Sequence, residues 1–307
     1  TASYSEDKDA PIGQYAVHIA DVDPVTLLGG RIGAPVTGDV HKHGGSEFSI
    51  GGVDTGLDRE ITSLTAKVTS DLANGMELVS ITNWLDLDKS HREDGGGGVD
   101  AFPFLTESVY EQWSQEFRLS GESEGFQWQV GAYYLDIEVE TRSAVGGPII
   151  TGSPFGIIDS FGMLESTNWS VFGQVEYDLN DSFTLIGGYR WSKDDKKIDF
   201  FNQATAGLVG VPDGTVLFNL ADEAVGEFAD VPVIDYGDYA ARLQLNWHMN
   251  DDALVFLSYN RGIKGGNWSL GSRIDIEKFQ HKEETLHAYE LGLKTTLADG
   301  RARLNAT

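Results

Sequence analysis

One pentapeptide has the residue types and spacing of a hydrolase nucleophile. Residues 121–125 read GESEG, which matches the G-x-S-x-G pattern. In that pattern the serine lies on a sharp strand-to-helix turn and works with a partner His and an acid. Here the stretches on both sides alternate as strands do and show no helical period. We therefore interpret Ser123 as a turn serine and expect no catalytic residue and no enzymatic activity.

Two further motifs resemble ligand-binding loops. Residues 41–43 read HKH, and two imidazoles at this spacing are able to hold a metal ion. Residues 91–100 read HREDGGGGVD, but this stretch lacks the Lys-Ser/Thr ending and the following helix of a phosphate-binding loop. Solvated side chains in glycine-rich loops explain both motifs, so we expect no metal site and no cofactor.

A third set of residues suits binding rather than catalysis. Guanidinium and ammonium groups hold an anion by charge, and aromatic rings pack against it. Side chains of these types lie where strand-like stretches meet long loops. The candidates for ligand binding are Trp84, Arg92, Arg142, Arg261, Lys264 and Trp268.

The composition limits the class of protein. Asp and Glu outnumber Lys and Arg by 48 to 22 in the 307 residues, which gives a formal net charge of −26. Nucleic-acid binding requires clustered basic residues, so we expect no nucleic-acid partner. Cysteine is absent, which excludes disulfides and thiolate metal sites in this chain. No run of about 18 apolar residues occurs, so the sequence predicts no transmembrane helix.

The elements that position the candidates are strands joined in pairs by tight turns. Asn-Gly and Asp-Gly, which tolerate positive φ, are among the turns. The pairs are 60–72 with 76–90, 111–121 with 126–142, 166–178 with 183–199, 237–249 with 253–264, and 285–297 with 301–307. Long stretches rich in Gly, Pro and Asp separate them, at 92–109, 143–165, 200–236 and 265–284, and residues 6–58 look similar. This arrangement predicts an all-β fold, an antiparallel up-and-down meander of about ten or eleven strands.

One face of five predicted strands carries no charge. Side chains of alternate residues lie on one face of a strand. The uncharged sets are Trp169 to Leu179, Phe183 to Trp191, Phe126 to Tyr134, Tyr239 to Trp247 and Tyr289 to Leu297, each taken at every second residue. The opposite faces hold Gln127, Gln129, Glu176, Asp178, Arg190, Arg242, Gln244, His248, Glu290 and Lys294. Residues 76–90 and 253–264 alternate less cleanly, and their parity stays open.

Aromatic residues on the uncharged face recur at a fixed spacing. The pairs Phe126 and Tyr134, Trp169 and Tyr177, Phe183 and Trp191, and Tyr239 and Trp247 are each eight residues apart. On tilted strands this spacing suits an apolar band about 25 Å tall between two aromatic girdles, as in a transmembrane barrel. A lipid-facing Lys or Arg would cost roughly 2–4 kcal/mol at the bilayer midplane, which explains the missing charges. The alternative is a soluble β protein with these aromatics in its core. Trp84 and Trp268 also fit a girdle.

Two stretches resemble the barrel signatures of the TonB-dependent receptor family. Residues 251–270 read DDALVFLSYNRGIKGGNWSL, in which an aromatic-Ser-aromatic-x-Arg-Gly strand end precedes a loop. Residues 287–307 read HAYELGLKTTLADGRARLNAT, a Tyr-Glu-x-Gly-x-Lys strand that runs to an Asp-Gly turn. Residues 113–121 and 170–194 also resemble middle strands of the family, and the resemblance covers most of 60–307.

The resemblance implies part of an outer-membrane barrel of a Gram-negative bacterium. Residues 1–307 would belong to one barrel domain, with the plug domain and terminal strands absent. The whole protein would take up a scarce ligand, most often a ferric siderophore, and would be driven by the TonB complex through the plug. The alternatives are a passive porin-like channel and a soluble β-sheet glycan-binding protein.

Membrane lipid and lipopolysaccharide are further expected partners. Residues 200–236 carry six acidic side chains, and no Lys or Arg occurs between Lys197 and Arg242. This acidic stretch would attract cations, with divalent ions bridging to lipopolysaccharide phosphates. The alternative is a solvated loop kept soluble by its charge. The acidic residues are Asp213, Asp222, Glu223, Glu227, Asp230 and Asp235.

Overall fold

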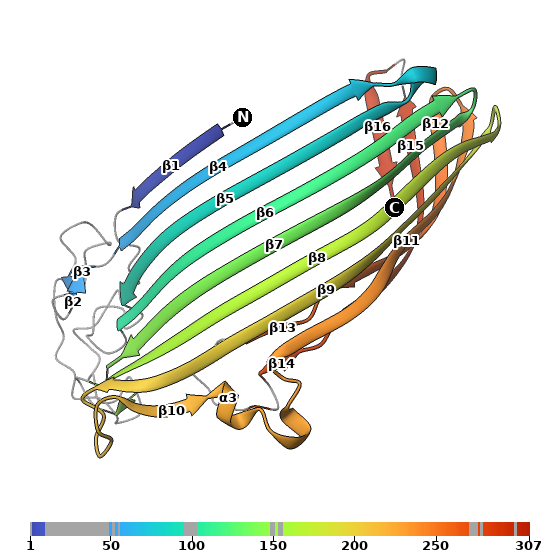
Figure 1. Ribbon diagram of the computed structural model, residues 1–307. Coiled ribbons are helices and arrows are strands. Elements are labelled where there is room, and N and C mark those ends of the chain that lie inside the picture. Colours follow the sequence, from blue (N-terminus) through green and yellow to red (C-terminus); the bar gives the residue numbers. More distant parts are fainter. Residues whose placement is uncertain are drawn as a thin grey trace, which may run out of the picture.

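The computed structural model describes residues 2–9, 49–50, 53–54, 56–94, 103–147, 151–152, 156–269, 276, 279–297 and 300–307. Long strands dominate the described part of the chain (Figure 1). The main strands are β1 (Ala2–Asp9), β4 (Gly56–Asp71), β5 (Glu77–Asp94), β6 (Pro103–Ser123), β7 (Phe126–Gly146), β8 (Ile157–Asn180), β9 (Phe183–Ala206), β11 (Val233–Asn250), β12 (Ala253–Lys264), β15 (Glu284–Leu297) and β16 (Ala302–Ala306). Short strands form the pairs β2 (Ser49–Ile50) with β3 (Val53–Asp54) and β13 (Asn267–Trp268) with β14 (Gln280–His281).

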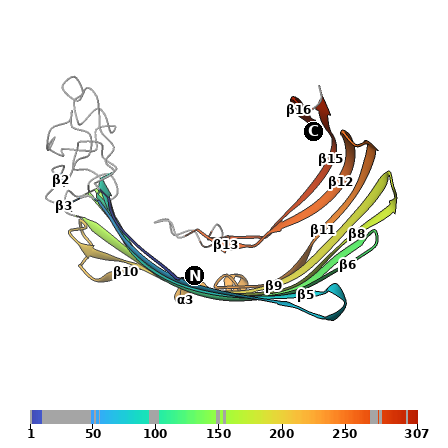
Figure 2. The ribbon, with the colours of Figure 1, turned by 90° about the horizontal axis from the view of Figure 1, so that it is seen from above.

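The main sheet is an antiparallel meander. Its order is β1-β4-β5-β6-β7-β8-β9-β11-β12-β15-β16, and β10 (Thr215–Asn219) pairs with the end of β9. All five predicted hairpins are present, each closed by a short turn. The sheet curves strongly and stays open between β1 and β16 (Figure 2). The predicted fold class is therefore confirmed.

The strands extend further toward the long loops than the alternation of residue types predicted. The stretch 143–165, expected as a loop, contains the end of β7 and the start of β8, and β6 begins within the expected loop 92–109. Beyond Tyr134 in β7 the polarity of the faces inverts. Asp136 and Glu138 share the face of Tyr134, whereas Leu135 and Ile137 lie on the other face. A constant apolar face is therefore lost there, although the backbone ladder continues.

The cross-strand register assigns every strand to the same two faces. Trp128 lies opposite Val175, which lies opposite Gly187, which lies opposite Leu243. Residues directly opposite share a face, so the uncharged sets of neighbouring strands form one continuous surface. The register also resolves the open parity, because Trp84 of β5 lies opposite Trp113 and Leu257 of β12 lies opposite Leu245.

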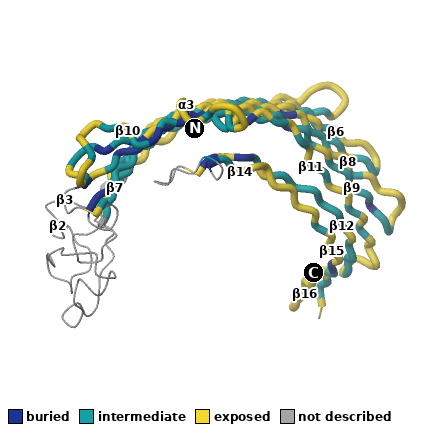
Figure 3. Tube along the Cα trace, turned by 90° about the horizontal axis from the view of Figure 1, so that it is seen from below, coloured by how far each residue is buried: buried dark blue, intermediate teal, exposed yellow. Residues whose placement is uncertain are grey.

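The buried core lies at the end of the sheet where long loops join the strands, which we call the loop end. We call this core the loop core. Ile198, Phe200 and Ile234 of the sheet pack against residues of the connecting segments. The latter are Phe218 of β10, Leu220 of the short helix α3 (Leu220–Glu223), Trp268 of β13 and Phe279. Because β13 and β14 lie on the concave side of the curved sheet (Figures 2 and 3), the Ile198 face is the concave face and the girdle residues lie on the convex one.

The structure describes one of the motifs that resemble catalytic or metal-binding sites. Ser123 ends β6 and pairs with Phe126 across a tight turn, so GESEG joins two strands and is not a nucleophile elbow. Residues 41–43 lie outside the described residues. No helix in the described part is long and apolar enough to cross a membrane.

Candidate functional site

The concave wall changes in chemistry from the loop end to the turn end. One apolar row crosses six strands near the loop end, with each residue directly opposite the next: Ile61, Leu87, Tyr110, Val139, Leu164 and Ile198. Below it lie amides and hydroxyls that bond across strands. Gln112 of β6 donates to Asn83 of β5 at 3.4 Å, and Asn83 donates to Thr65 of β4 at 2.8 Å. This wall is the candidate ligand-facing surface.

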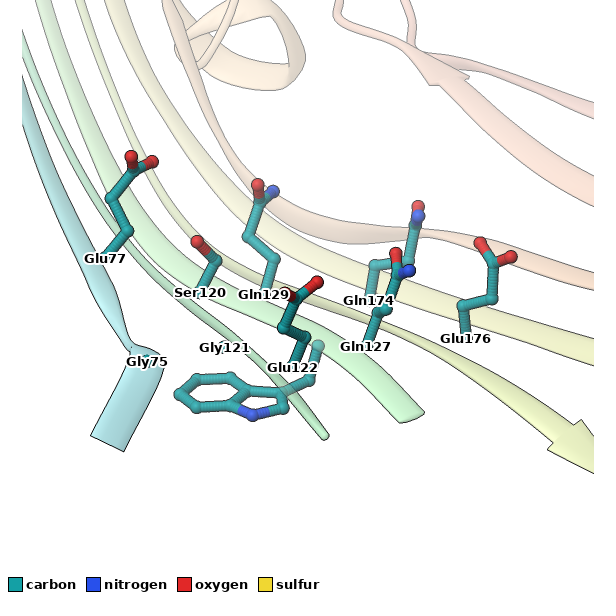
Figure 4. A pocket seen from close by; sticks show the side chains of 10 residues that line it. Gly75, Glu77, Ser120, Gly121, Glu122, Gln127, Gln129, Gln174 and Glu176 are labelled. Atoms are coloured by element: carbon teal, nitrogen blue, oxygen red, sulfur yellow. The ribbon is translucent and has the colours of Figure 1, made fainter. Parts of the chain in front are cut away.

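The turn end of the wall carries amides and carboxylates. A hollow of about 400 Å³ there is lined by Glu77, Glu122, Gln127, Gln129, Gln174 and Glu176, among others. Figure 4 shows that these side chains rise from the same side of neighbouring strands. None of the residues lining this hollow is basic, so it suits a cation or a neutral hydrogen-bonding group better than an anion.

A second hollow, of about 410 Å³, lies nearer the middle of the wall. Arg190 and Arg242 line it together with Phe172, Gln174 and Asn260. Gly188 lies directly opposite Arg242, and Ala240 lies directly opposite Arg190. Neither of these two neighbours has a side chain beyond Cβ, which leaves room beside the two arginines.

Both guanidiniums are held by neutral groups. Arg190 lies 5.7 Å from the ring centroid of Phe172 and 5.6 Å from that of Tyr133, and its Nε donates to Ser192 at 3.3 Å. Arg242 donates to the amide oxygen of Gln244 at 2.5 Å. Among the described residues, no carboxylate oxygen lies within 4.0 Å of either guanidinium, in contrast to Arg118, Arg142 and Arg261.

The structure does not bring the six predicted ligand residues together. Trp84, Arg92, Arg142 and Arg261 share the face of the girdle residues, since Trp84 lies opposite Trp113 and Arg261 lies opposite Ala241. The prediction placed them near the long loops, where Arg92, Arg142 and Arg261 lie, whereas Trp84 lies closer to the turn end of β5. It did not apply the two-residue alternation to their side chains, and this alternation directs all four away from the concave wall.

Two of these arginines already have carboxylate partners. Arg142 contacts Asp159 and Glu107, each at 3.1 Å, and these acceptors raise the pKa of its guanidinium above the usual value. Arg261 contacts Asp238 at 2.9 Å and lies over the ring of Tyr239, at 4.0 Å from the centroid. These contacts fasten neighbouring strands to one another, so both guanidiniums are less available to a ligand.

The last two predicted residues lie by the inward-folded loop. Lys264 ends β12 and contacts the carboxylate of Glu284 at 3.3 Å. Trp268 is only 6% exposed and donates its Nε1 hydrogen to the Val231 carbonyl at 2.6 Å. Trp268 is thus part of the loop core, where it has little surface for either a ligand or a lipid.

The eight predicted girdle residues all lie on the convex face, in two groups. Near the turns, Phe126 contacts Tyr177 and Phe183 stacks on Trp247, with ring centroids 6.2 and 6.1 Å apart. Near the loop end, Trp169 contacts Trp191 at 4.8 Å, Trp113 contacts Tyr134 at 5.6 Å, and Tyr189 stacks on Tyr239 at 5.6 Å. Contact of these rings with lipid remains a prediction.

Sequence reasoning missed the arginine pair as a site. The alternation did place Arg190 and Arg242 on the charged face, and that parity was the signal available. What it lacked was the strand register, which makes the two residues neighbours and leaves Gly188 and Ala240 beside them. Within the described residues, no group of three or more His, Asp or Glu side chains is arranged to hold a metal ion.

Comparison with known proteins identifies the family. The model of the TonB dependent receptor-like, beta-barrel family matches residues 13–307. The chain belongs to this family. As a TonB-dependent receptor barrel, it comes from the outer membrane of a Gram-negative bacterium, as the sequence predicted. Tight turns of such barrels are periplasmic and long loops are extracellular, so we expect the loop core at the extracellular end.

Solved structures with this fold include three transport proteins. The ferric yersiniabactin uptake receptor FyuA from Yersinia pestis is 18% identical, with a TM-score of 0.63, over 82% of this chain and 36% of that one. The ferric-catecholate import receptor Fiu from Escherichia coli K12, in its closed form, is 10% identical, with a TM-score of 0.63, over 99% and 47%. The copper transporter OprC is 11% identical, with a TM-score of 0.55, over 79% and 38%. This receptor chain spans less than half the length of each.

Proposed function

We propose that the whole protein is an active outer-membrane transporter for an anionic ferric siderophore, energised through TonB, and not an enzyme. Residues 1–307 form part of its barrel domain, and the plug domain through which TonB acts lies outside this chain. Family membership supports a receptor or transporter. The yersiniabactin and catecholate receptors named above support a ferric ligand.

One observation carries the choice of an anionic ligand. In a chain with a formal net charge of −26, two guanidiniums without carboxylate partners in the described part face the concave wall. Arg190 is half-buried and Arg242 is exposed, and positive charge on a wall of this kind attracts negative charge in a ligand. Two further interactions remain proposals. The acidic stretch 200–236 would bind cations, and the barrel would contact lipopolysaccharide.

The test is uptake of radioactive iron by whole cells. Cells with and without the gene are starved of iron and supplied with ferric complexes of anionic siderophores, with and without a protonophore that removes the energy source. We expect gene-dependent uptake that the protonophore abolishes. A tonB deletion should have the same effect as the protonophore.

Other outcomes identify the alternatives. Gene-dependent uptake that persists with the protonophore and in the tonB deletion would mean a passive porin-like channel. Absence of any gene-dependent uptake, with the receptor verified at the cell surface, would contradict the siderophore assignment. The third alternative, a soluble glycan-binding protein, is not supported by the outer-membrane family of this chain.

A further inference from the structure

The two guanidiniums without a carboxylate partner in the described part line one hollow of the concave wall. Arg190 lies opposite Ala240 and Arg242 lies opposite Gly188, so the arginines are diagonal neighbours on β9 and β11. Diagonal neighbours on one face of a sheet are about 7–8 Å apart. That is the separation of the backbone positions; the Arg190 side chain lies over Phe172 of β8, and the Arg242 side chain bonds to Gln244 along β11. An anion that contacts both would offset two positive charges at once.

The surroundings fix the direction of both side chains. Phe172 and Tyr133 hold Arg190 by ring contacts, and Gln244 holds Arg242 by a hydrogen bond at 2.5 Å. The ring of Phe172 is itself placed by Gly131, because a Cβ there would lie 2.4 Å from Cζ of Phe172. Less side-chain entropy is then lost when the guanidiniums bind a ligand.

The donor groups that line the hollow suit a planar oxyanion. Each guanidinium presents a planar fork of N–H donors that matches a carboxylate. Asn260 also lines the hollow and supplies an amide that can donate to a further oxygen. The missing side chains at Gly188 and Ala240 leave room for the group to approach both forks.

We propose that Arg190 and Arg242 together form an oxyanion-binding site that holds a carboxylate partway down the lumen. The inference deepens the proposed function, on which it rests, since it names the chemical group of the ligand that the wall recognises. The carboxylate has two sources, a free ligand or the rest of a full-length receptor, and the test separates them.

The experiment measures arginine modification by phenylglyoxal in the purified full-length receptor, with peptides quantified by mass spectrometry. Sodium citrate without iron is the probe. At about ten times its Kd, citrate occupies the site and should slow modification of Arg190 and Arg242 roughly tenfold by mass action. Arg142 is the control, because Asp159 and Glu107 already bind it and citrate should leave its rate unchanged.

Variants test whether the two arginines act as a pair. In Arg242→Gln, citrate should no longer protect Arg190, and in Arg190→Gln it should no longer protect Arg242. Arg242→Lys keeps the charge without the planar fork, so protection of Arg190 should be partial. Unfolding temperatures of all variants are measured without citrate.

The outcomes separate the sources of the carboxylate. Reactive arginines that citrate protects, with unchanged unfolding temperatures of the variants, assign the site to a free ligand. Arginines that are unreactive without citrate, with Arg242→Gln lowering the unfolding temperature, assign it to a carboxylate of the receptor itself. Equal reactivity with and without citrate, together with unchanged unfolding temperatures, would overturn the proposal. Since the probe carries no iron, a failure of ferric uptake leaves this result intact.

Discussion

Glycine beside an aromatic ring is one recurring contact in this sheet, and Gly131 shows its cost most clearly. A Cβ at Gly131 would lie 2.4 Å from the Phe172 ring and 2.6 Å from the Phe117 carbonyl oxygen. We therefore expect Gly131→Ala to lower the free energy of unfolding by about 1–3 kcal/mol through overpacking. Gly187→Ala is the control, since its Cβ would meet only Val175, at an ordinary 3.7 Å. Equal stabilities of the two variants in a lipid unfolding assay would contradict this account.

The second residue-scale prediction concerns the two faces of β11. Leu243 is 54% exposed on the convex face, and Gln244 lies next to it on the concave face. If the convex face meets lipid, Leu243→Arg should destabilise the full-length barrel by roughly 2–4 kcal/mol, and Gln244→Arg should cost much less. Val175→Arg and Gln174→Arg repeat the comparison on β8. Similar costs on both faces would exclude the proposed lipid contact.

Residue types and period were enough to predict the faces but not the contacts. Alternation placed Val175 and Leu243 on one surface and Arg190 and Arg242 on the other, because the two-residue period is local. The partners of Arg190 lie on β7 and β8, and the partner of Arg261 lies on β11. Such contacts depend on the register between strands, which no single stretch of sequence contains.

At the scale of elements, the inward fold of the β13–β14 segment depends on two glycines. A Cβ at Gly265 would lie 3.0 Å from the Tyr236 hydroxyl and 3.1 Å from Asp194, and one at Gly266 would lie 2.8 Å from the His281 carbonyl. Lys196 donates to the Gly266 carbonyl at 2.9 Å. The chain can turn inward after β12 only because these two residues lack side chains.

Trp268 is the main apolar anchor of this segment. Trp268→Ala removes a 6% exposed indole and its hydrogen bond to Val231, and large-to-small changes of this kind cost about 3–5 kcal/mol. We expect faster hydrogen exchange in β13, β14 and residues 226–234, with β5 to β8 unchanged. Asn267→Ala, at the exposed neighbouring position, is the control. Unchanged exchange in the Trp268 variant would mean that the loop core is held by other contacts.

A row of carboxylates crosses the convex face just beyond the aromatic group that lies nearer the loop end. Asp86 lies opposite Glu111, which lies opposite Glu138, which lies opposite Glu165. Like charges directly opposite on a sheet are destabilising by several tenths of a kcal/mol. Glu111→Gln should therefore raise the free energy of unfolding by about 0.2–1 kcal/mol and weaken its dependence on salt. Glu124→Gln, in the exposed turn between β6 and β7, is the control, and an equal gain there would contradict the repulsion.

The lengths of elements were the least predictable feature. The sequence located all five tight turns, because turn chemistry is local. It ended the strands too early at the loop end, where the convex face changes from apolar residues to the acidic row. A prediction that follows one apolar face stops where that face becomes acidic. Strand pairing depends on the backbone, so it continues beyond that point.

At the scale of the whole molecule, the proposed orientation is testable from outside the cell. Gly152 is exposed at the loop end, and a Cβ there meets nothing within 4 Å. An epitope inserted after Gly152 should bind antibody on intact cells. The same epitope inserted after Asp181, in the turn between β8 and β9, should bind only after the outer membrane is opened. The reverse pattern would place the tight turns outside.

The meander has a consequence for how the protein assembles. Neighbouring long strands of the main sheet follow one another in the chain, so we expect the wall to form hairpin by hairpin. The loop core differs, because it closes only when Ile198, Ile234 and Trp268 have all been placed. We therefore expect closure of that core to be a late folding step. A chain arrested before this step would have a complete sheet in the membrane but no packed core at the loop end.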